Sequence, residues 1–332
     1  MTNKRWDVVA LGEAMVEFNQ TDVNQPRHFL QGFGGDTSNA IIAAARQGAR
    51  TAYLSRLGRD VFGQWLMDLW AQEGVHTGGV MWDDTGAPTG LYFVTHGPKG
   101  HEFSYARAGS AASRMQPQDL SVDLIQSSRH LHVSGISQAI SESATDTVFA
   151  AIELARLGST EVAYDPNVRL RLWSAERARS VILKTMSLCD WFMPSLEDLQ
   201  WLSGLQDEHA LLDWCHAHGS HRVILKMGGR GVWFSLIDSH RTHWSAHPVQ
   251  VKDATGAGDC FDGAFLSQLS VAFDPATGAS PDVGSPEWTK TVHACVAYAN
   301  AAAALTTQGF GAVAPLPRPE QVRDLLSRSQ LA

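Results

Sequence analysis

The sequence lacks the features of membrane, secreted and nucleic-acid-binding proteins. No apolar run is long enough to span a bilayer, and no apolar signal-peptide core precedes the first strand-like segment at Trp6, so we expect a cytoplasmic protein. Acidic residues outnumber basic ones, 34 to 26, and the net charge of −8 leaves no basic surplus to neutralise a nucleic acid. With 44% hydrophobic and 18% charged residues, the composition is typical of a soluble globular chain.

Cysteine is also scarce, and several catalytic motifs are absent. The cysteines form no C-x-x-C pair and are predicted to be reduced thiols: Cys189, Cys215, Cys260 and Cys295. Neither H-E-x-x-H nor G-x-S-x-G occurs, so the motifs that normally indicate a metalloprotease or a serine hydrolase are absent. His130 and His132 share a strand face that a metal could use, but we interpret them as ordinary histidines. No Gly-Lys dipeptide exists, which excludes a Walker A phosphate loop.

The most informative stretch is residues 253–263, D-A-T-G-A-G-D-C-F-D-G, directly before an amphipathic helix pattern. Around Gly256, Ala257 and Gly258, backbone N–H groups can close on an oxyanion, and the helix that follows adds its positive N-terminal end. Asp259 comes next, although a carboxylate repels a phosphate. Its presence is explained if it takes a proton from a hydroxyl while the amides hold the phosphoryl group. Taken alone, the stretch also fits an ordinary helix start with a capping acid.

Strand-like and helix-like segments alternate along most of the chain. This predicts an α/β fold with a doubly wound, mostly parallel sheet and helices on both faces. The strands are expected near residues 8–11, 51–57, 130–134, 161–165, 190–194 and 221–226, with an antiparallel edge at 231–236 and 241–246. The helices are expected near residues 39–48, 61–72, 142–157, 174–187, 207–218, 261–269 and 289–305. No repeat or linker divides the chain, so we predict a single domain over residues 1–332.

Residues 89–107 interrupt this alternation. They form two alternating segments joined across residues 96–101, which predicts a β-hairpin. Together with strands within residues 13–32, the hairpin is expected to form a small sheet over a cleft, where it would act as a lid. We expect the strand at Glu13–Phe18 to be half-exposed and one of residues 36–38 to cap the helix that follows.

Two arginines are candidates for substrate binding. Tyr105 and Arg107 lie on the same face of the predicted hairpin, and Arg169 follows the strand expected at residues 161–165. Because an arginine fork matches a carboxylate bidentately, these residues suit an acidic, hydroxylated substrate, although surface salt bridges explain them equally well. The glycine-rich residues 32–37 lack the third glycine of a dinucleotide-binding turn, which disfavours an oxidoreductase.

Three motifs, in order, resemble those of the PfkB (ribokinase-like) sugar kinases, and the resemblance covers nearly the whole chain. G-F-G-G-D-T-S-N at residues 32–39 looks like the N-terminal signature of that family, and G-R-D-V-F-G at residues 58–63 is similar to its second fingerprint. Residues 253–259 look like its C-terminal signature, which is highly specific. Within the family, the resemblance is greatest to the 2-keto-3-deoxygluconate kinases, through residues 33–37, 105–112, 134–137 and 165–173.

The resemblance implies a ribokinase-like fold, ATP, Mg²⁺ and phosphorylation of the C6 hydroxyl of 2-dehydro-3-deoxy-D-gluconate. It implies that Asp259 is the base and that the anion hole consists of the amides of Gly256, Ala257 and Gly258. The residues implied to bind substrate, with both arginines on its carboxylate, are Gly34, Gly35, Asn39, Tyr92, Tyr105, Arg107 and Arg169. Those implied to border the nucleotide are Ser195, Lys226, Gly228, Gly231, Gly256, Gly258 and Asn300.

One position departs from the family pattern. Where the family often carries N-x-x-E, this chain has S-L-E-D at residues 195–198, so Asp198, with Glu197 as the alternative, would help to place Mg²⁺. The family also often binds a monovalent cation near its C-terminal signature, and Asp253 and Thr255 leave such a site open. By analogy with this fold we expect a homo-oligomer, a dimer or larger.

Three alternative functions stay open. The same fold could act on a neutral sugar such as fructose or ribose, or on a nucleoside, and the roles of Arg107 and Arg169 discriminate between these and a sugar acid. A non-catalytic sugar-binding protein would have no use for Asp259 beside an anion hole. A nicotinamide-dependent oxidoreductase is the third, and binding of the cofactor would test it.

Overall fold

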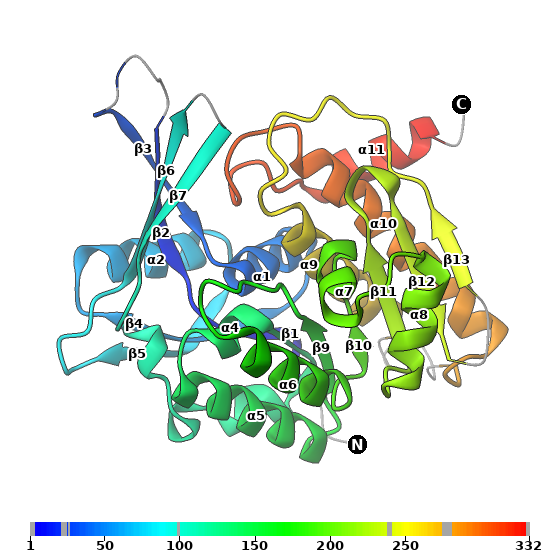
Figure 1. Cartoon of the computed structure of the whole chain (residues 1–332), viewed down its shortest axis with the longest axis horizontal. Helices are drawn as coiled ribbons and strands as arrows, with labels where there is room; N and C mark the ends of the chain where they lie inside the picture. Colours follow the sequence, from blue (N-terminus) through cyan, green and yellow to red (C-terminus); the bar gives the residue numbers. More distant parts are fainter. Residues whose placement is uncertain are drawn as a thin grey trace.

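The computed structural model describes residues 4–20, 25, 27–97, 100–237, 241–273 and 281–329. Its strands form two sheets, a large one of nine strands and a separate small one of four. Figure 1 shows the small sheet standing apart from the large one, at the upper left of the view. The predicted class is confirmed: a large, mostly parallel sheet with helices, and a small additional sheet.

The large sheet has the strand order β13-β12-β11-β10-β9-β8-β1-β4-β5. Its strands are β1 (Trp6–Leu11), β4 (Thr51–Gly58), β5 (His76–Asp83), β8 (Ser128–Ser134), β9 (Glu161–Asp165), β10 (Trp191–Phe192), β11 (Arg222–Lys226), β12 (Val232–Leu236) and β13 (Arg241–Trp244). Neighbours pair in parallel from β5 to β11, and β12 and β13 add the predicted antiparallel edge. Only β5 was not predicted from the apolar pattern, because Gly78 and Gly79 interrupt it.

Helices cover both faces of the large sheet. They are α1 (Asp36–Arg46), α2 (Val61–Gln72), α3 (Val122–Gln126), α4 (Gly135–Ala139), α5 (Glu142–Leu157), α6 (Ala175–Met186), α7 (Leu196–Ser203), α8 (Glu208–Ala217), α9 (Ala257–Ala272), α10 (Pro286–Thr306) and α11 (Pro319–Ser329). One buried apolar layer contains side chains of α1, α2, α9 and α10, and the other contains side chains of α5, α6, α7 and α8. None of the described helices combines the length and the apolar composition that crossing a bilayer requires.

The small sheet has the strand order β3-β2-β6-β7. Its strands are β2 (Met15–Gln20), β3 (Phe29–Gly34), β6 (Gly90–Gly97) and β7 (Gly100–Ala106). The pair β6–β7 is antiparallel, with Tyr92 opposite Tyr105, which confirms the predicted hairpin; residues 98 and 99 of its turn lie outside the described residues. β2 joins the hairpin to β3, because it pairs in parallel with β6 and antiparallel with β3.

Two local expectations are wrong. The segment Glu13–Phe18 was expected to be half-exposed, but Glu13 and Glu17 are only 2% and 4% exposed, because both carboxylates have hydrogen-bond partners inside the molecule. The helix after β3 has no side-chain cap: it begins at Asp36, and the preceding cap residue is Gly35. The Asp36 carboxylate is buried and is directed to other partners, described below.

The two histidines of β8 are buried and electrically neutral. His130 and His132 are 5% and 2% exposed, and the described residues contain no group of three or more side chains that could hold a metal ion. Burial lowers the pKa of each imidazole from 6.5 to about 4. The unfolded chain therefore takes up protons below pH 6.5 that the folded protein resists, so stability is lost as the pH falls toward 4.

We therefore expect His130→Gln to reduce the sensitivity of the protein to mild acid. In the wild type, each neutral histidine should lower the free energy of unfolding by about 2 kcal/mol between about pH 7 and about pH 5. Glutamine cannot be protonated, so the variant should avoid about one such loss in urea denaturation at these two pH values. His221→Gln, at an exposed position, is the control and should behave as the wild type. An unchanged pH dependence in His130→Gln would contradict this account.

Candidate active site

Helix α9 begins where the sequence predicts an anion hole. Its cap residue, Gly256, has a φ of 76°, and a Cβ there would lie 3.0 Å from the Ala312 carbonyl oxygen, so the position requires glycine. The N–H of Ala257 donates to the Ala254 carbonyl at 3.2 Å. Within the described part of the chain, no protein acceptor pairs with the amides of Gly256 and Gly258. These two of the three predicted amides are therefore open to an oxyanion.

Helices α1 and α9 touch through their backbones. A Cβ on Gly263 of α9 would collide with the carbonyl oxygen of Ala40 in α1, so only glycine permits this approach. The contact brings together Asn39, predicted to bind substrate, and Asp259, predicted to be the base. The Asn39 Nδ2 donates to Asp259 Oδ2 at 2.8 Å, although 220 residues separate the two in the sequence.

Asp259 lies in a cluster of acidic side chains. Asp36 at the start of α1 and Asp165 at the end of β9 are both buried. Burial, reinforced by the charges of Asp36 and Asp165, raises the pKa of Asp259 to about 7. The hydrogen bond from Asn39 and the charge of Lys226 favour the ionised form and limit this rise. The carboxyl group is thus poised to exchange a proton near neutral pH.

Lys226 is held between two carboxylates. Its Nζ lies 2.9 Å from Asp165 Oδ2 and 2.9 Å from both carboxylate oxygens of Asp262. Although burial disfavours the ammonium, these two carboxylates raise the pKa of Lys226, so the side chain stays positively charged. A Cβ on Gly258 would lie 3.7 Å from Nζ. The lysine predicted to border the nucleotide is therefore a fixed cation beside the open amides.

The loop after β9 closes onto the start of α1. Asn167, with a φ of 32°, donates its Nδ2 to Asp36 Oδ2 at 3.0 Å, and its N–H bonds Asp165 Oδ1 at 3.0 Å. Ser134, at the end of β8, favours the ionised form of Asp36 and so limits the rise that burial causes in its pKa. Gly35, directly before α1, has a φ of 109°, which favours glycine. The carboxyl ends of β8, β9 and β11 thus meet the N-termini of α1 and α9, as the sequence predicts for an α/β sheet.

On the side of the small sheet, buried glutamates bind two of the predicted substrate residues. Arg107 forms an ion pair with Glu13, and the two side chains are 11% and 1% exposed. The Tyr92 hydroxyl donates to Glu17 Oε2 at 2.6 Å. It also lies against Gly34, where a Cβ would collide with it. The arginine predicted to hold a substrate carboxylate thus already has a carboxylate partner.

Aromatic contacts link these residues to Tyr105 but not to Arg169. The Tyr105 ring stacks on that of Tyr92 with centroids 5.9 Å apart, and the Arg107 guanidinium lies 5.8 Å from the Tyr105 centroid. Arg169 is exposed and donates to the Val168 carbonyl at 2.9 Å. That Arg107 and Arg169 hold one substrate carboxylate therefore stays a prediction.

Predicted nucleotide residues support the segment that leads to the residue 253–259 motif. Gly231 has a φ of 94°, and a Cβ there would collide with the Trp244 carbonyl. Gly228 opens the same turn, with a φ of 55°. Asn300 in α10 is 8% exposed and donates its Nδ2 to the Ser245 carbonyl at 2.9 Å. These residues hold the chain after β13 in place, and their contact with a nucleotide stays a prediction.

Ser195 and Asp198 cap helix α7. Ser195 Oγ accepts from the Asp198 N–H at 3.1 Å, and Asp198 Oδ2 accepts from the Ser195 N–H at 3.4 Å. Asp198 Oδ1 accepts from the Val168 N–H at 3.0 Å, so both carboxylate oxygens serve backbone amides. Glu197 is exposed. Asp198 thus caps the helix, and its contact with a metal ion, directly or through water, stays a prediction.

Asp253 has a similar internal role. Its Oδ1 accepts from the N–H and the hydroxyl of Thr255 at 2.9 and 2.6 Å. Its Oδ2 accepts from the N–H of Gly311 at 3.0 Å. The residue thus fastens the loop before α9, and a monovalent cation at this position stays a prediction.

Comparison with known proteins identifies the family. The model of the pfkB family carbohydrate kinases matches residues 6–319. The chain belongs to the pfkB family. Among curated relatives, it is 33% identical to "Probable fructokinase-4" of Arabidopsis thaliana, over 96% of each chain. It is 32% identical to "Fructokinase-1" of Zea mays, over 97% of this chain and 98% of the relative. The family prediction is confirmed, whereas the finer resemblance to 2-keto-3-deoxygluconate kinases is not supported by these relatives.

Solved structures of pfkB-type kinases have the same fold. A fructokinase from Xylella fastidiosa with bound ATP has a TM-score of 0.86 and 26% identity, over 98% of this chain and 99% of that one. A fructokinase from Vibrio cholerae O395 in a fructose, ADP and calcium ion bound form has a TM-score of 0.83 and 27% identity, over 96% and 98%. The predicted ribokinase-like fold is thereby confirmed.

Sequence reasoning missed several charged residues of the site. Glu13 and Glu17 lie in an alternating segment, in which acidic residues normally mark the solvent side. Asp262 was not singled out, although a detectable signal exists: it is an acid three residues after Asp259, within the apolar face of α9. Asp36 was interpreted only as a possible helix cap. In each case, the side chain that stabilises the buried acid is distant in the sequence.

The backbone contact between α1 and α9 should be sensitive to one methyl group. Alanine normally favours a helix over glycine by about 1 kcal/mol, but at Gly263 its Cβ would push α9 away from Ala40. We expect Gly263→Ala to lower the free energy of unfolding by about 1–3 kcal/mol, measured by chemical denaturation. Gly229→Ala is the control, because nothing lies within 4 Å of a Cβ there. A Gly263→Ala protein as stable as the control would show that the two helices can separate freely.

Proposed function

We propose that the protein is an ATP-dependent kinase of a neutral hexose, with fructose as the first candidate. Curated relatives at 33% and 32% identity are named fructokinases, and a solved structure at 27% identity is a fructokinase in a fructose- and ADP-bound form. The observation that carries the choice of a neutral sugar is the ion pair between Arg107 and Glu13.

Glu13 neutralises the arginine that would otherwise hold a sugar acid. Its carboxylate is buried, pairs with Arg107 and accepts from the Ser110 hydroxyl at 2.5 Å. A substrate carboxylate entering beside Arg107 would be repelled by Glu13, and this repulsion is strong where water is excluded. A sugar hydroxyl adds no charge and can donate to a carboxylate or accept from a guanidinium. The ion pair between Glu13 and Arg107 therefore favours a neutral polyhydroxylated substrate.

In this proposal Asp259 is the base of the phosphoryl transfer. A carboxyl group with a pKa of about 7 is substantially ionised at neutral pH and is still basic enough to take a proton from a hydroxyl in the transition state. The sugar oxygen attacks the γ-phosphorus of ATP, the bond to ADP breaks, and Asp259 retains the proton. The amides of Gly256 and Gly258 would face the negative charge of the phosphoryl group, and Lys226 adds a positive charge beside them.

Mg²⁺ would neutralise the phosphates of ATP when bound. The described residues contain no cluster of three or more side chains that could hold a metal ion by themselves. This fits an ion that arrives with the nucleotide and is held largely by phosphate oxygens and water. The solved relative from Xylella fastidiosa is described with bound ATP, which supports ATP as the donor.

The small sheet would serve as the lid of this site. It carries Tyr92 and Tyr105, and Arg107 follows its last strand. Burial first, and then the charges that include Glu17 and Asp259, raise the pKa of Tyr92, which supports a position of this sheet next to the base. Closure over a bound sugar would exclude water, which otherwise competes with the sugar for the phosphoryl group.

The role of Asp259 can be tested by removing its basicity alone. We expect Asp259→Asn to lower kcat by roughly 10²–10⁴-fold, because the amide cannot accept the proton, while the sugar still binds. ATP consumption measures kcat, and calorimetry measures sugar binding. Asp146→Asn, at an exposed position on α5, is the control for loss of one carboxylate. Near-normal turnover in Asp259→Asn would remove this residue from the mechanism.

The choice of substrate can be tested with the wild type and Glu13→Gln. We expect the wild type to phosphorylate fructose in preference to 2-dehydro-3-deoxy-D-gluconate, ribose and adenosine. In Glu13→Gln, the unpaired charge of Arg107 should raise kcat/KM for the sugar acid relative to fructose by roughly tenfold, because a charged hydrogen bond becomes available. Glu17→Gln is the control, since Glu17 bonds Tyr92 and not Arg107.

The possible outcomes separate the parts of this proposal. A wild-type preference for the sugar acid would reject the neutral substrate but keep the kinase mechanism. An unchanged substrate ratio in Glu13→Gln would show that the ion pair does not select the substrate. No turnover on any of the four compounds would overturn the proposed function.

A further inference from the structure

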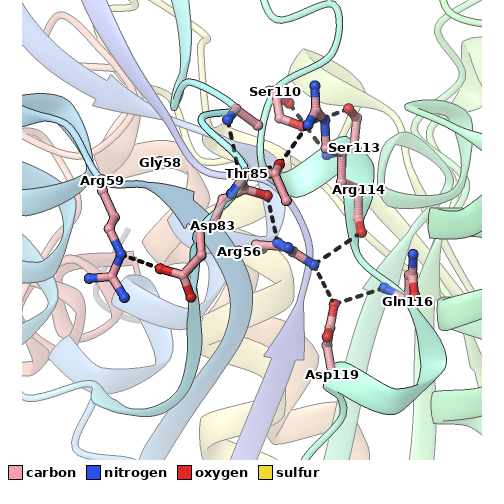
Figure 2. Close-up of polar contacts among 12 residues, drawn as sticks. Arg56, Gly58, Arg59, Asp83, Thr85, Ser110, Ser113, Arg114, Gln116 and Asp119 are labelled. Atoms are coloured by element: carbon pink, nitrogen blue, oxygen red, sulfur yellow. Dashed lines mark hydrogen bonds and ion pairs between the residues drawn. The ribbon is translucent and has the colours of Figure 1, made fainter.

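The second fingerprint of the sequence, residues 58–63, has no part in the site described so far. It lies next to a network of polar contacts at the carboxyl ends of β4 and β5, shown in Figure 2. Two chain segments that carry the small-sheet hairpin pass through this network. The first stalk, residues 84–89, joins β5 to β6, and the second stalk, residues 107–119, follows β7.

Asp83, the last residue of β5, organises the first stalk. Its fully buried Oδ1 accepts from the N–H and the hydroxyl of Thr85 at 2.8 and 2.7 Å, and from the N–H of Ala87 at 3.0 Å. Its Oδ2 lies 2.9 Å from Nε of Arg56 in β4. Since the side chains of Arg56 and Asp83 are 17% and 0% exposed, water screens this ion pair only weakly.

The fingerprint holds the far end of the same stalk. Asp60 Oδ1 caps helix α2 by accepting from the Gly63 N–H at 2.8 Å, and its Oδ2 accepts from the Thr89 N–H at 2.8 Å. The Thr89 hydroxyl accepts from the Gly58 N–H at 3.1 Å. A Cβ on Gly58 would lie 2.6 Å from the Ala87 carbonyl oxygen, so only glycine at position 58 leaves room for the first stalk. The fingerprint residues Gly58 and Asp60 therefore form the seat of the first stalk.

Arg56 binds the second stalk as well. Its NH1 donates to Asp119 Oδ2 at 3.2 Å and to the Arg114 carbonyl at 3.4 Å (Figure 2). The two stalks also contact each other, because NH1 of Arg114 donates to the Thr85 hydroxyl at 2.7 Å. One guanidinium in the large sheet thus fastens both connections to the small sheet.

The chain of each stalk comes into contact with Glu13. The first continues into β6 at Gly90, where a Cβ would lie 2.9 Å from Glu13 Oε1. From the second, the Ser110 hydroxyl donates to the same oxygen at 2.5 Å. Glu13 in turn pairs with Arg107, so a shift of either stalk moves the group that faces the sugar.

We propose that Arg56 and Asp60 are positioning residues that set the sugar affinity of the site by fixing the stalks of the small sheet. The inference rests on the proposed kinase function, because it assigns Arg107 and Tyr92 to the sugar. Neither residue is among the groups that we place in contact with the sugar or with ATP. Asp259, Lys226 and the open amides belong to the large sheet and its helices, so the nucleotide side should be unaffected.

Arg56→Met and Asp60→Asn test this inference. Methionine keeps much of the length of the arginine but loses its contacts with both stalks. Asparagine keeps one oxygen as the cap of α2 but places an amide group, which cannot accept, at Thr89. We expect each variant to raise KM for the sugar by roughly tenfold, with kcat and KM for ATP changed less than about twofold. Arg59→Met is the matched control, because Arg59 pairs with the stalk residue Asp84 in an exposed contact at 2.5 Å that water screens.

Hydrogen exchange gives a readout that does not depend on turnover. In Arg56→Met and Asp60→Asn, the amides of β6 and β7 should exchange faster than in Arg59→Met, while those of α9 stay unchanged. A loss of kcat with unchanged sugar KM, or equal changes in the sugar and ATP KM values, would indicate general destabilisation and overturn the inference. Parameters equal to those of Arg59→Met would overturn it too.

The same measurements distinguish this inference from the choice of substrate. The variants are compared with the wild type on whichever sugar the wild type phosphorylates best. A wrong substrate assignment therefore shows in the wild type itself, and a wrong role for the stalks shows only in the ratio between variant and wild type.

Discussion

The active site depends on the direct backbone contact of α1 with α9. Because Gly263 has no side chain, the two helices approach until one nearly touches the carbonyl oxygen of Ala40 in the other. Their N-termini then meet at one point, so that Asn39 reaches Asp259. A helix N-terminus carries a partial positive charge and open amides, and both favour an anionic group. This contact assembles the anion site and the candidate base together.

Burial and crowding of carboxylates at this point raise the pKa of Asp259. Asp36, Asp165 and Asp262 are all buried near it, and Lys226 lies between two of them. An isolated acid on a helix would be ionised and weakly basic at neutral pH. Here burial and like charges raise the pKa of Asp259 to about 7, while the charge of Lys226 limits this rise. The pKa of Asp259 therefore depends on all the charged groups of the cluster together.

At the small sheet, by contrast, two buried glutamates have partners within the protein. Glu13 pairs with Arg107, and Glu17 accepts from Tyr92. Arg107 thus already has a carboxylate partner, which agrees with the fructokinase relatives better than with a sugar-acid substrate. Ser110 of the second stalk donates to Glu13, so the residue that pairs with Arg107 also contacts a segment that attaches the small sheet.

The sequence by itself determined the α/β alternation, the hairpin of residues 89–107, the helix start after Gly256 and the position of Asp259 next to it. Each of these follows from interactions within one element or one turn, which a local pattern records. Only the tertiary structure decided which charges meet. Arg107 looked free to bind a carboxylate because its partner Glu13 is 94 residues away. The sequence also gave no sign that Asp198 binds the Val168 amide, which belongs to another loop. The net charge and pKa of a buried group depend on such distant partners, and the chain brings them together only when it folds.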